Sequence, residues 1–306
     1  MSKKLRFDLD VDASALLAAN PEAFYSKAYL SEENVADNYR LLPGVKSKTK
    51  LATVLFGNVL QSSSCPFDAP TDDLNAVEID VCALSAMAQI CQFDLEQSFV
   101  ALQMTKGSNG DFSVASFMDF YWNEMAKQIG QDIELIRWQG DTTSANATLA
   151  LCDGYIKNLL ADATVVDVAN TTVTASNVLA ELAKVFAAAP ASIIRKKADL
   201  RLYVSTNVAN AYELAAAQGN TLTYVTTPLA LTYLGVKVVV CEGMPNDTAV
   251  LTLKDNLLYA FDAEGDDKAL RAVNLSDTVA EPYIRTRANM KVGFVHVNGA
   301  EVVLYS

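Results

Sequence analysis

The sequence predicts an α+β fold built around one long amphipathic helix. Three observations support this prediction. Apolar residues recur at helical spacing over residues 113–138, apolar and polar residues alternate over 75–83 as in a half-buried strand, and residues 257–305 are mostly strand-like. Strands and helices do not alternate regularly enough for a doubly wound parallel sheet, and the chain has no visible internal repeat.

The composition is that of an acidic, globular chain. Its 306 residues include 24 Lys and Arg against 36 Asp and Glu, which gives a formal net charge of −12, and 51% are hydrophobic. This balance excludes a disordered chain and argues against a broad basic face that grips phosphate backbones. The first residues lack the apolar core of a signal peptide, and no run of eighteen apolar residues follows, so we expect a soluble chain made in the cytoplasm, with no membrane partner.

The first part of the chain predicts segments with little core of their own. Residues 1–44 show no sustained period beyond a possible short helix at 31–40, so they predict an arm. Residues 45–74 predict an extended hairpin that starts after a Pro-Gly turn. In it Lys46, Lys48 and Lys50 occupy alternate positions, so a strand would place their ammonium groups on one face. A solvated strand face is the simpler interpretation of these lysines.

The long helix at 113–138 would span about 38 Å, enough to cross a whole domain. Its predicted buried stripe consists of Phe117, Phe120, Tyr121, Met125, Ile129, Ile133 and Ile136. Residues 142–257 then predict a mixed α/β region. Its expected helices are 149–160, 176–189 and 207–218, and its expected strands are 200–205, 236–241 and 249–253. A shorter helix is expected near 94–103.

No residue pattern in the chain predicts catalysis, cofactor binding or a metal site. The five cysteines (Cys65, Cys82, Cys91, Cys152 and Cys241) are scattered without a C-x-x-C pair, which favours buried free thiols over zinc or a disulfide framework. The single histidine, His296, sits in an apolar strand, and no G-x-S-x-G nucleophile elbow is present, so a core or surface histidine is expected. The acidic loop 262–267 lacks the ligand order of a calcium loop. P-loop, dinucleotide-binding and kinase motifs are missing too, so we do not expect an enzyme.

The order of these parts, together with several local strings, resembles the major capsid proteins of tailed phages, which have the Hong Kong 97-type fold. The strings are Leu-Pro-Gly-Val-Lys-Ser-Lys at 42–48, Phe-Tyr-Trp-Asn-Glu at 120–124, Arg-Trp-Gln-Gly-Asp at 137–141, Leu-Cys-Asp-Gly at 151–154, Asp-Leu-Arg-Leu-Tyr-Val-Ser at 199–205, Pro-Leu at 228–229 and Tyr-Leu-Gly-Val-Lys-Val at 233–238. None is a catalytic signature, so the resemblance rests on their joint order and spacing over nearly the whole chain.

The resemblance implies a division into four parts. These are an N-terminal arm (1–44), an extended loop (45–74), a peripheral domain (75–140 and 258–297, with the spine helix at 113–138) and an axial domain (141–257 and 298–306). It also implies a structural protein of the virion that self-assembles into pentamers and hexamers, which form an icosahedral head shell around double-stranded DNA. Its partners would be further copies of itself, a separate scaffolding protein, a portal and decoration proteins.

Two alternatives stay open: an encapsulin-like compartment shell, and a soluble α/β enzyme or ligand-binding protein with its site in 141–257. Under the capsid interpretation, Lys46, Lys48 and Lys50 should meet carboxylates of a neighbouring subunit. The acidic residues Asp262, Glu264, Asp266 and Asp267 should gather around a local threefold and pair with Arg271, Arg285 or Arg287 of neighbours. A lysine–asparagine cross-link is not expected, since no catalytic Glu can be assigned by spacing.

Overall fold

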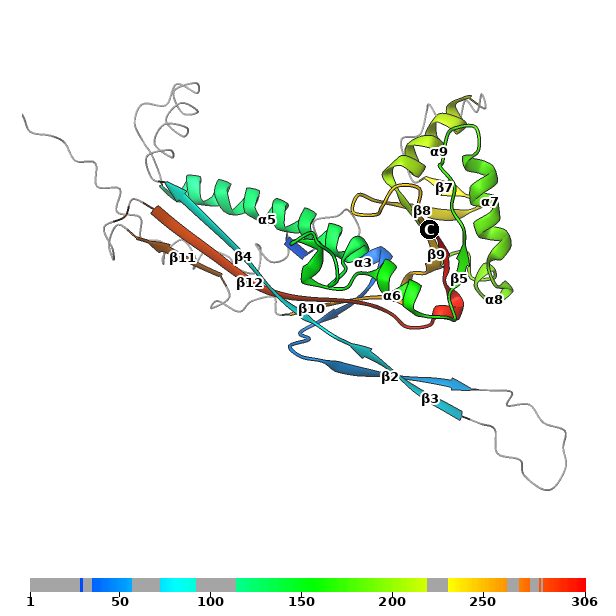
Figure 1. Ribbon diagram of the computed structural model, residues 1–306, viewed down its shortest axis with the longest axis horizontal. Coiled ribbons are helices and arrows are strands. Elements are labelled where there is room, and N and C mark those ends of the chain that lie inside the picture. Colours follow the sequence, from blue (N-terminus) through cyan, green and yellow to red (C-terminus); the bar gives the residue numbers. More distant parts are fainter. Residues whose placement is uncertain are drawn as a thin grey trace, which may run out of the picture. The chain divides into compact units, whose positions relative to one another are not determined.

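The computed structural model describes residues 28–29, 35–56, 72–91, 114–218, 231–262, 270–275, 281 and 283–306 (Figure 1). The chain divides into two compact units. Unit 1 comprises Met1–Ser31, Ala83–Gly130 and Ala263–Met290, and unit 2 comprises Glu32–Cys82, Gln131–Asp262 and Lys291–Ser306. Helices and mixed sheets together confirm the predicted α+β class. The four-part division of the sequence into arm, loop, peripheral and axial domains stays a prediction.

The long helix α5 spans Val114–Gln139 and differs from the predicted 113–138 by one residue at each end. Its buried residues follow helical spacing, as expected of an amphipathic helix. They include Trp122, Ala126, Ile129, Ile133 and Ile136, each at most 8% exposed. Met125 is half-buried, whereas the side chains of Phe117, Phe120 and Tyr121 lie outside the described residues. The predicted stripe is therefore confirmed in the C-terminal half of the helix.

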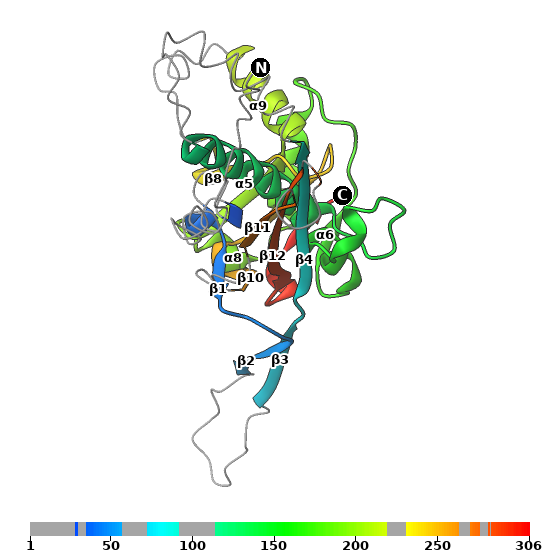
Figure 2. The same ribbon diagram turned by 90° about the vertical axis from the view of Figure 1, so that its left-hand side faces the viewer.

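In unit 1, two strands flank the first half of β12, which spans Tyr283–His296 in all. Strand β11 (Leu270–Asn274) pairs antiparallel with it on one side, with Arg271 opposite Arg287 and Val273 opposite Arg285. Strand β4 (Cys82–Cys91) also pairs with β12. Helix α5 runs along these strands in both views (Figures 1 and 2).

In unit 2, the second half of β12 pairs antiparallel with β10 (Leu257–Phe261), and β10 pairs in parallel with β1 (Arg40–Pro43). The short helix α3 (Val35–Asn38) precedes β1 and is the described part of the helix expected at 31–40. The helix expected near 94–103 lies outside the described residues.

Unit 2 also holds a six-stranded mixed sheet in the order β5-β13-β9-β6-β8-β7. Its strands are β5 (Val166–Val168), β6 (Leu200–Ser205), β7 (Thr232–Tyr233), β8 (Val236–Cys241), β9 (Ala249–Leu253) and β13 (Val303–Tyr305). Strands β6, β8 and β9 have the predicted bounds. The β6–β8 and β5–β13 pairs are parallel and the other pairs are antiparallel, as expected of a sheet that is not doubly wound.

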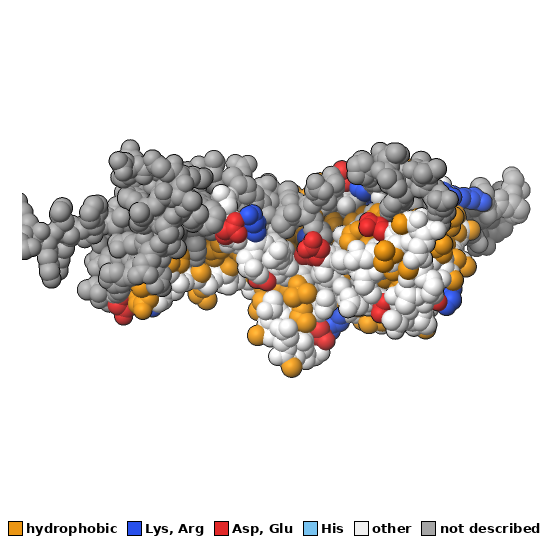
Figure 3. All heavy atoms as spheres, turned by 90° about the horizontal axis from the view of Figure 1, so that it is seen from above, with side chains coloured by type: hydrophobic (Ala, Val, Ile, Leu, Met, Phe, Trp, Pro, Cys, Tyr) orange, Lys and Arg blue, Asp and Glu red, His pale blue; other side chains and the backbone are white. Residues whose placement is uncertain are grey.

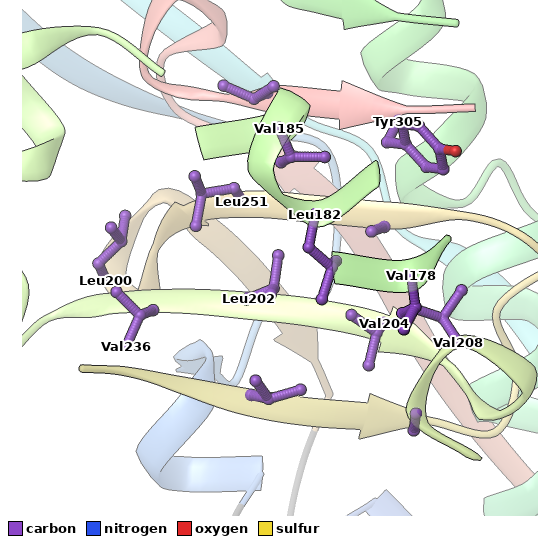
Figure 4. Close-up of a cluster of buried hydrophobic side chains, with 14 of the residues drawn as sticks. Val178, Leu182, Val185, Leu200, Leu202, Val204, Val208, Val236, Leu251 and Tyr305 are labelled. Atoms are coloured by element: carbon purple, nitrogen blue, oxygen red, sulfur yellow. The ribbon is translucent and has the colours of Figure 1, made fainter. Parts of the chain in front are cut away.

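Helices α7 (Val178–Ala188) and α9 (Thr206–Gln218) pack on this sheet, and a short helix α8 (Ala191–Ile194) follows α7. Figure 4 shows Leu182 and Val185 of α7 directed at Leu202 and Leu251 of the sheet, and all four are at most 4% exposed. Full burial of one such side chain contributes about 1.5–3 kcal/mol. The sheet and its helices therefore have a core of their own.

A two-stranded antiparallel hairpin forms the third sheet. Strand β2 (Thr49–Phe56) pairs with β3 (Asp72–Ile79), from Thr49 opposite Ile79 to Phe56 opposite Asp72. The single strand expected at 75–83 was wrong in one respect: β3 ends at Ile79, and β4 begins at Cys82 with a different partner. Alternation continues through residues 80–81, so the sequence pattern does not show the break.

The helix expected at 149–160 is also interrupted. A 3₁₀ turn at Leu149–Leu151 is followed by α6 at Tyr155–Ala161. Between them the Gly154 amide donates to the Gly140 carbonyl at 2.9 Å, and a Cβ on Gly140 would lie 2.3 Å from the Cys152 carbonyl oxygen. The two backbones are too close for any side chain, so this contact replaces a continuous helix.

A disulfide joins Cys82 to Cys152, with 5.7 Å between their Cα atoms, so the expectation of free thiols was wrong for this pair. The two residues are 70 positions apart, and only the fold brings them together. The thiols of Cys91 and Cys241 do not take part in a disulfide, and Cys65 lies outside the described residues.

Aromatic side chains from six segments of unit 2 meet in one cluster. Trp138 is fully buried and contacts the rings of Tyr155 and Tyr203 at centroid distances of 5.4 and 5.6 Å. Around them lie Tyr39, Tyr259, Phe261 and Phe294. The Arg137 guanidinium is 4.9 Å from the Tyr39 ring and 4.7 Å from the Tyr259 ring, a cation–π arrangement that suits a buried arginine.

Candidate assembly surfaces

The predicted lysine row lies at the start of the β2–β3 hairpin. Lys50 is in β2, whereas Lys46 and Lys48 precede the strand. Glu78 of β3 stands directly opposite Lys50, and its carboxylate binds both Lys48 (2.7 Å) and Lys50 (2.8 Å). Hydrogen bonds from these two ammonium groups lower the pKa of Glu78 to about 2. Sequence reasoning missed Glu78, which becomes visible only when the hairpin register is known.

Lys291 of β12 links two of the predicted contact residues within unit 2. Its ammonium group donates to the Lys46 carbonyl at 2.6 Å and lies 3.9 Å from the Asp262 carboxylate. A Cβ on Gly293, two residues further along β12, would lie 2.4 Å from the Asp80 carbonyl oxygen. Together with the Cys82–Cys152 disulfide, these contacts hold the residues that precede β2 and those that follow β3.

Of the predicted acidic contact residues, Glu264, Asp266 and Asp267 lie outside the described residues.

The predicted arginines gather on the exposed face of the unit 1 sheet. Arg285 Nε donates to Gln89 Oε1 at 2.8 Å, and Arg287 Nε donates to Asn289 Oδ1 at 2.8 Å and Ser85 Oγ at 3.2 Å. Arg271 lies opposite Arg287 on β11. We call Arg271, Arg285 and Arg287 the arginine face. Their pairing with the acidic loop of a neighbour stays a prediction.

The unit 2 sheet domain exposes apolar side chains at several points. Leu179 of α7 is 51% exposed and Leu214 of α9 is 57% exposed, and Leu234 in the β7–β8 turn reaches 59%. Figure 3 shows apolar side chains among polar ones on the surface of the described residues. Apolar side chains that are exposed singly are common on protein surfaces, so these three residues do not by themselves indicate a contact surface.

His296 is a largely buried structural residue. Its Nε2 lies 2.8 Å from Oδ2 of Asp162, the residue that ends α6, and its side chain is 11% exposed. Burial alone would raise the pKa of Asp162, but hydrogen bonds from His296 and Thr164 outweigh it and lower that pKa. The pair ties α6 to the end of β12. Its place in the core agrees with the prediction for this histidine.

A second charged group surrounds Lys157 of α6. Its ammonium group lies 2.7 Å from both Asp141 and Asp153, and its hydrogen bond lowers the pKa of Asp141 to about 2.

Over the described residues, no three His, Cys, Asp or Glu side chains are grouped so as to hold a metal ion. No helix in the same residues is long and apolar enough to cross a membrane.

The sequence matches no protein-family model and no curated protein. The fold, however, is similar to solved shell structures along almost its whole length. A chain of the satellite phage P4 procapsid that includes the size determination (Sid) protein has a TM-score of 0.57 at 13% identity, covering 93% of this chain and 98% of that one.

Two further structures are similar. A chain of the native GTA particle capsid has a TM-score of 0.57 at 13% identity, with 90% of both chains covered. A virus-like particle from Pyrococcus furiosus has a TM-score of 0.52 at 8% identity, covering 93% of this chain and 96% of that one. The chain therefore has the Hong Kong 97-type fold of tailed-phage major capsid proteins.

Proposed function

We propose that this chain is a major capsid protein that self-assembles into pentamers and hexamers of an icosahedral phage head, and that this head encloses double-stranded DNA. The observation that carries the proposal is the near-complete coverage, 93% of this chain and 98% of the P4 procapsid chain. The virion location of the chain, its synthesis in the host cytoplasm and its scaffolding, portal and decoration partners are parts of the same proposal.

The charge of the chain supports enclosure of DNA without adhesion to it. A formal net charge of −12 gives the shell wall an excess of carboxylates. Each phosphate gripped by Lys or Arg would hold the genome against the wall and make its release depend on salt. An acidic subunit avoids this binding of the genome to the wall.

An encapsulin-like compartment is the second candidate, and the similarity to the Pyrococcus furiosus virus-like particle favours it. Electron microscopy of the purified chain tests both. Closed shells or rings of five and six subunits are the expected result. A stable small oligomer under all conditions would contradict the proposal and favour an enzyme or binding protein with a site in 141–257. Packaged DNA in particles from infected cells would separate a phage head from a compartment.

The hairpin lysines are proposed to contact a neighbouring subunit. Changing Lys46, Lys48 and Lys50 together to Ser should lower the melting temperature of assembled shells and leave that of the unassembled chain nearly unchanged, because exposed ion pairs add little to subunit folding but recur at every contact of a shell. The matched control changes the exposed Arg-Lys-Lys at 195–197 to Ser, with the same loss of charge. Equal shell melting in the two variants would contradict the contact.

A further inference from the structure

The sheet of unit 1 has two chemically opposite faces. On β12 the residues Ile284, Thr286 and Ala288 are at most 2% exposed, and Thr286 Oγ1 lies 4.0 Å from Met125 Sδ of α5. Helix α5 thus covers this face, as both views show (Figures 1 and 2). The alternate residues Arg285 and Arg287 point to the other face and are exposed.

The arginine face brings like charges together. Arg271 and Arg287 stand directly opposite each other on paired strands, and like charges in such a pair are destabilising. Arg285 and Arg287 donate hydrogen bonds to the neutral side chains of Gln89, Ser85 and Asn289. Within the described ranges, no carboxylate forms an ion pair with any of the three arginines. An acidic partner would turn this local repulsion into attraction.

The arginine face ends at a sheet edge. Among the described strands, β11 pairs with β12 alone, so its outer side is an edge. An edge strand presents backbone N–H and C=O groups to which a further extended segment can bind. A strand added here would continue both faces of the sheet, and its side chains would need to be apolar toward α5 and acidic toward the arginines.

The sequence contains a segment with this two-sided pattern. Residues 7–12 read Phe-Asp-Leu-Asp-Val-Asp, so a strand there would have Phe7, Leu9 and Val11 on one face and three aspartates on the other. On this face β11 carries Arg271 and Val273, so the aspartates would stand beside Arg271, with Arg285 and Arg287 one strand further away on β12. We propose that residues 7–12 of the same chain add to the outer edge of β11, with their aspartates on the arginine face and their apolar side chains continuing the face under α5.

The covalent connection favours the chain's own segment as the occupant. Ala28 and Tyr29 are buried at 0% and 1% exposure, and the fifteen residues 13–27 between them and the segment can span up to about 50 Å when extended. A tether of this length gives an effective concentration in the millimolar range. The acidic loop 262–267 fits less well, because a strand with Asp262, Glu264 and Asp266 on one face would carry Ala263, Gly265 and Asp267 on the other.

Hydrogen exchange of the full chain, read by mass spectrometry over peptides that contain residues 7–12, tests the proposal. These amides should exchange more slowly than in a free peptide of residues 1–14. Arg271→Glu with Arg287→Glu should speed their exchange by about tenfold, since opposite charges become like charges across the pair. Adding Asp8→Arg, Asp10→Arg and Asp12→Arg to that variant should restore the protection.

The control reverses Arg195 and Lys196 to Glu, which changes the net charge by the same amount at an exposed site of unit 2 and should leave residues 7–12 protected. Exchange as fast as in the free peptide, or protection that the arginine reversal does not alter, would overturn the proposal. So would a response confined to residues 262–269, which would assign the face to the acidic loop. The measurement needs no shell, so it can fail or succeed independently of the capsid function.

Discussion

Replacing Trp138 by alanine is expected to lower the free energy of unfolding by about 3–5 kcal/mol. The indole is fully buried, and its neighbours Tyr155 and Tyr203 belong to α6 and β6, so no single element can move to fill the cavity. Part of the loss comes from the edge-to-face and tilted ring contacts, which exceed the effect of buried area alone. Urea unfolding of the unassembled chain, followed by far-UV circular dichroism, measures the change.

The matched control is Gln131→Ala, on the exposed side of the same helix. It should change the free energy of unfolding by less than about 0.5 kcal/mol, as surface substitutions usually do. If Trp138→Ala behaved like this control, the aromatic cluster would not be the centre of the unit 2 fold.

Breaking the Cys82–Cys152 disulfide is the second change with a large expected effect. The bridge closes a loop of 70 residues, and the chain-entropy estimate for such a loop is about 4 kcal/mol. Cys82→Ala with Cys152→Ala should therefore lower the unfolding free energy by roughly that amount. Alanine avoids placing a new hydroxyl at position 152, where the cysteine is only 2% exposed.

A reducing agent provides the internal check. It should destabilise the unchanged chain about as much as the double substitution does, and it should have no further effect on the double variant. Cys91→Ala, which removes a free thiol, serves as the control and should keep the response to reduction. A chain whose unfolding is insensitive to the reducing agent would contradict the presence of the bridge.

Local sequence patterns predicted the bounds of one helix and three strands. Helix α5 and strands β6, β8 and β9 were placed to within a residue. The failures share one cause, which is contact between distant segments. The Gly140–Gly154 backbone approach ends a helix that the pattern would continue, and the disulfide joins cysteines that no spacing rule connects.

The assembly surfaces were predictable to the same extent. Lys46, Lys48, Lys50, Arg285 and Arg287 could be selected from charge and alternation alone. The partner of Lys48 and Lys50, Glu78, and the juxtaposition of Arg271 with Arg287 could not, because both depend on strand register. The sequence gives the type of each residue, but the pairing of two strands determines which residues become cross-strand neighbours.

The position of β13 in the six-stranded sheet links folding to protein synthesis. This strand is the last of the six in the chain, yet it lies between β5 and β9 and pairs with both. Between β5 and β13 the ribosome must add 134 residues (169–302), which takes roughly 7–27 s at ~5–20 residues per second. During that time β5 has no strand to pair with in the sheet, so a nascent chain that stalls before residue 303 keeps both β5 and the outer side of β9 unpaired. We expect proteases to recognise these unpaired strands and to degrade interrupted chains before they join other subunits.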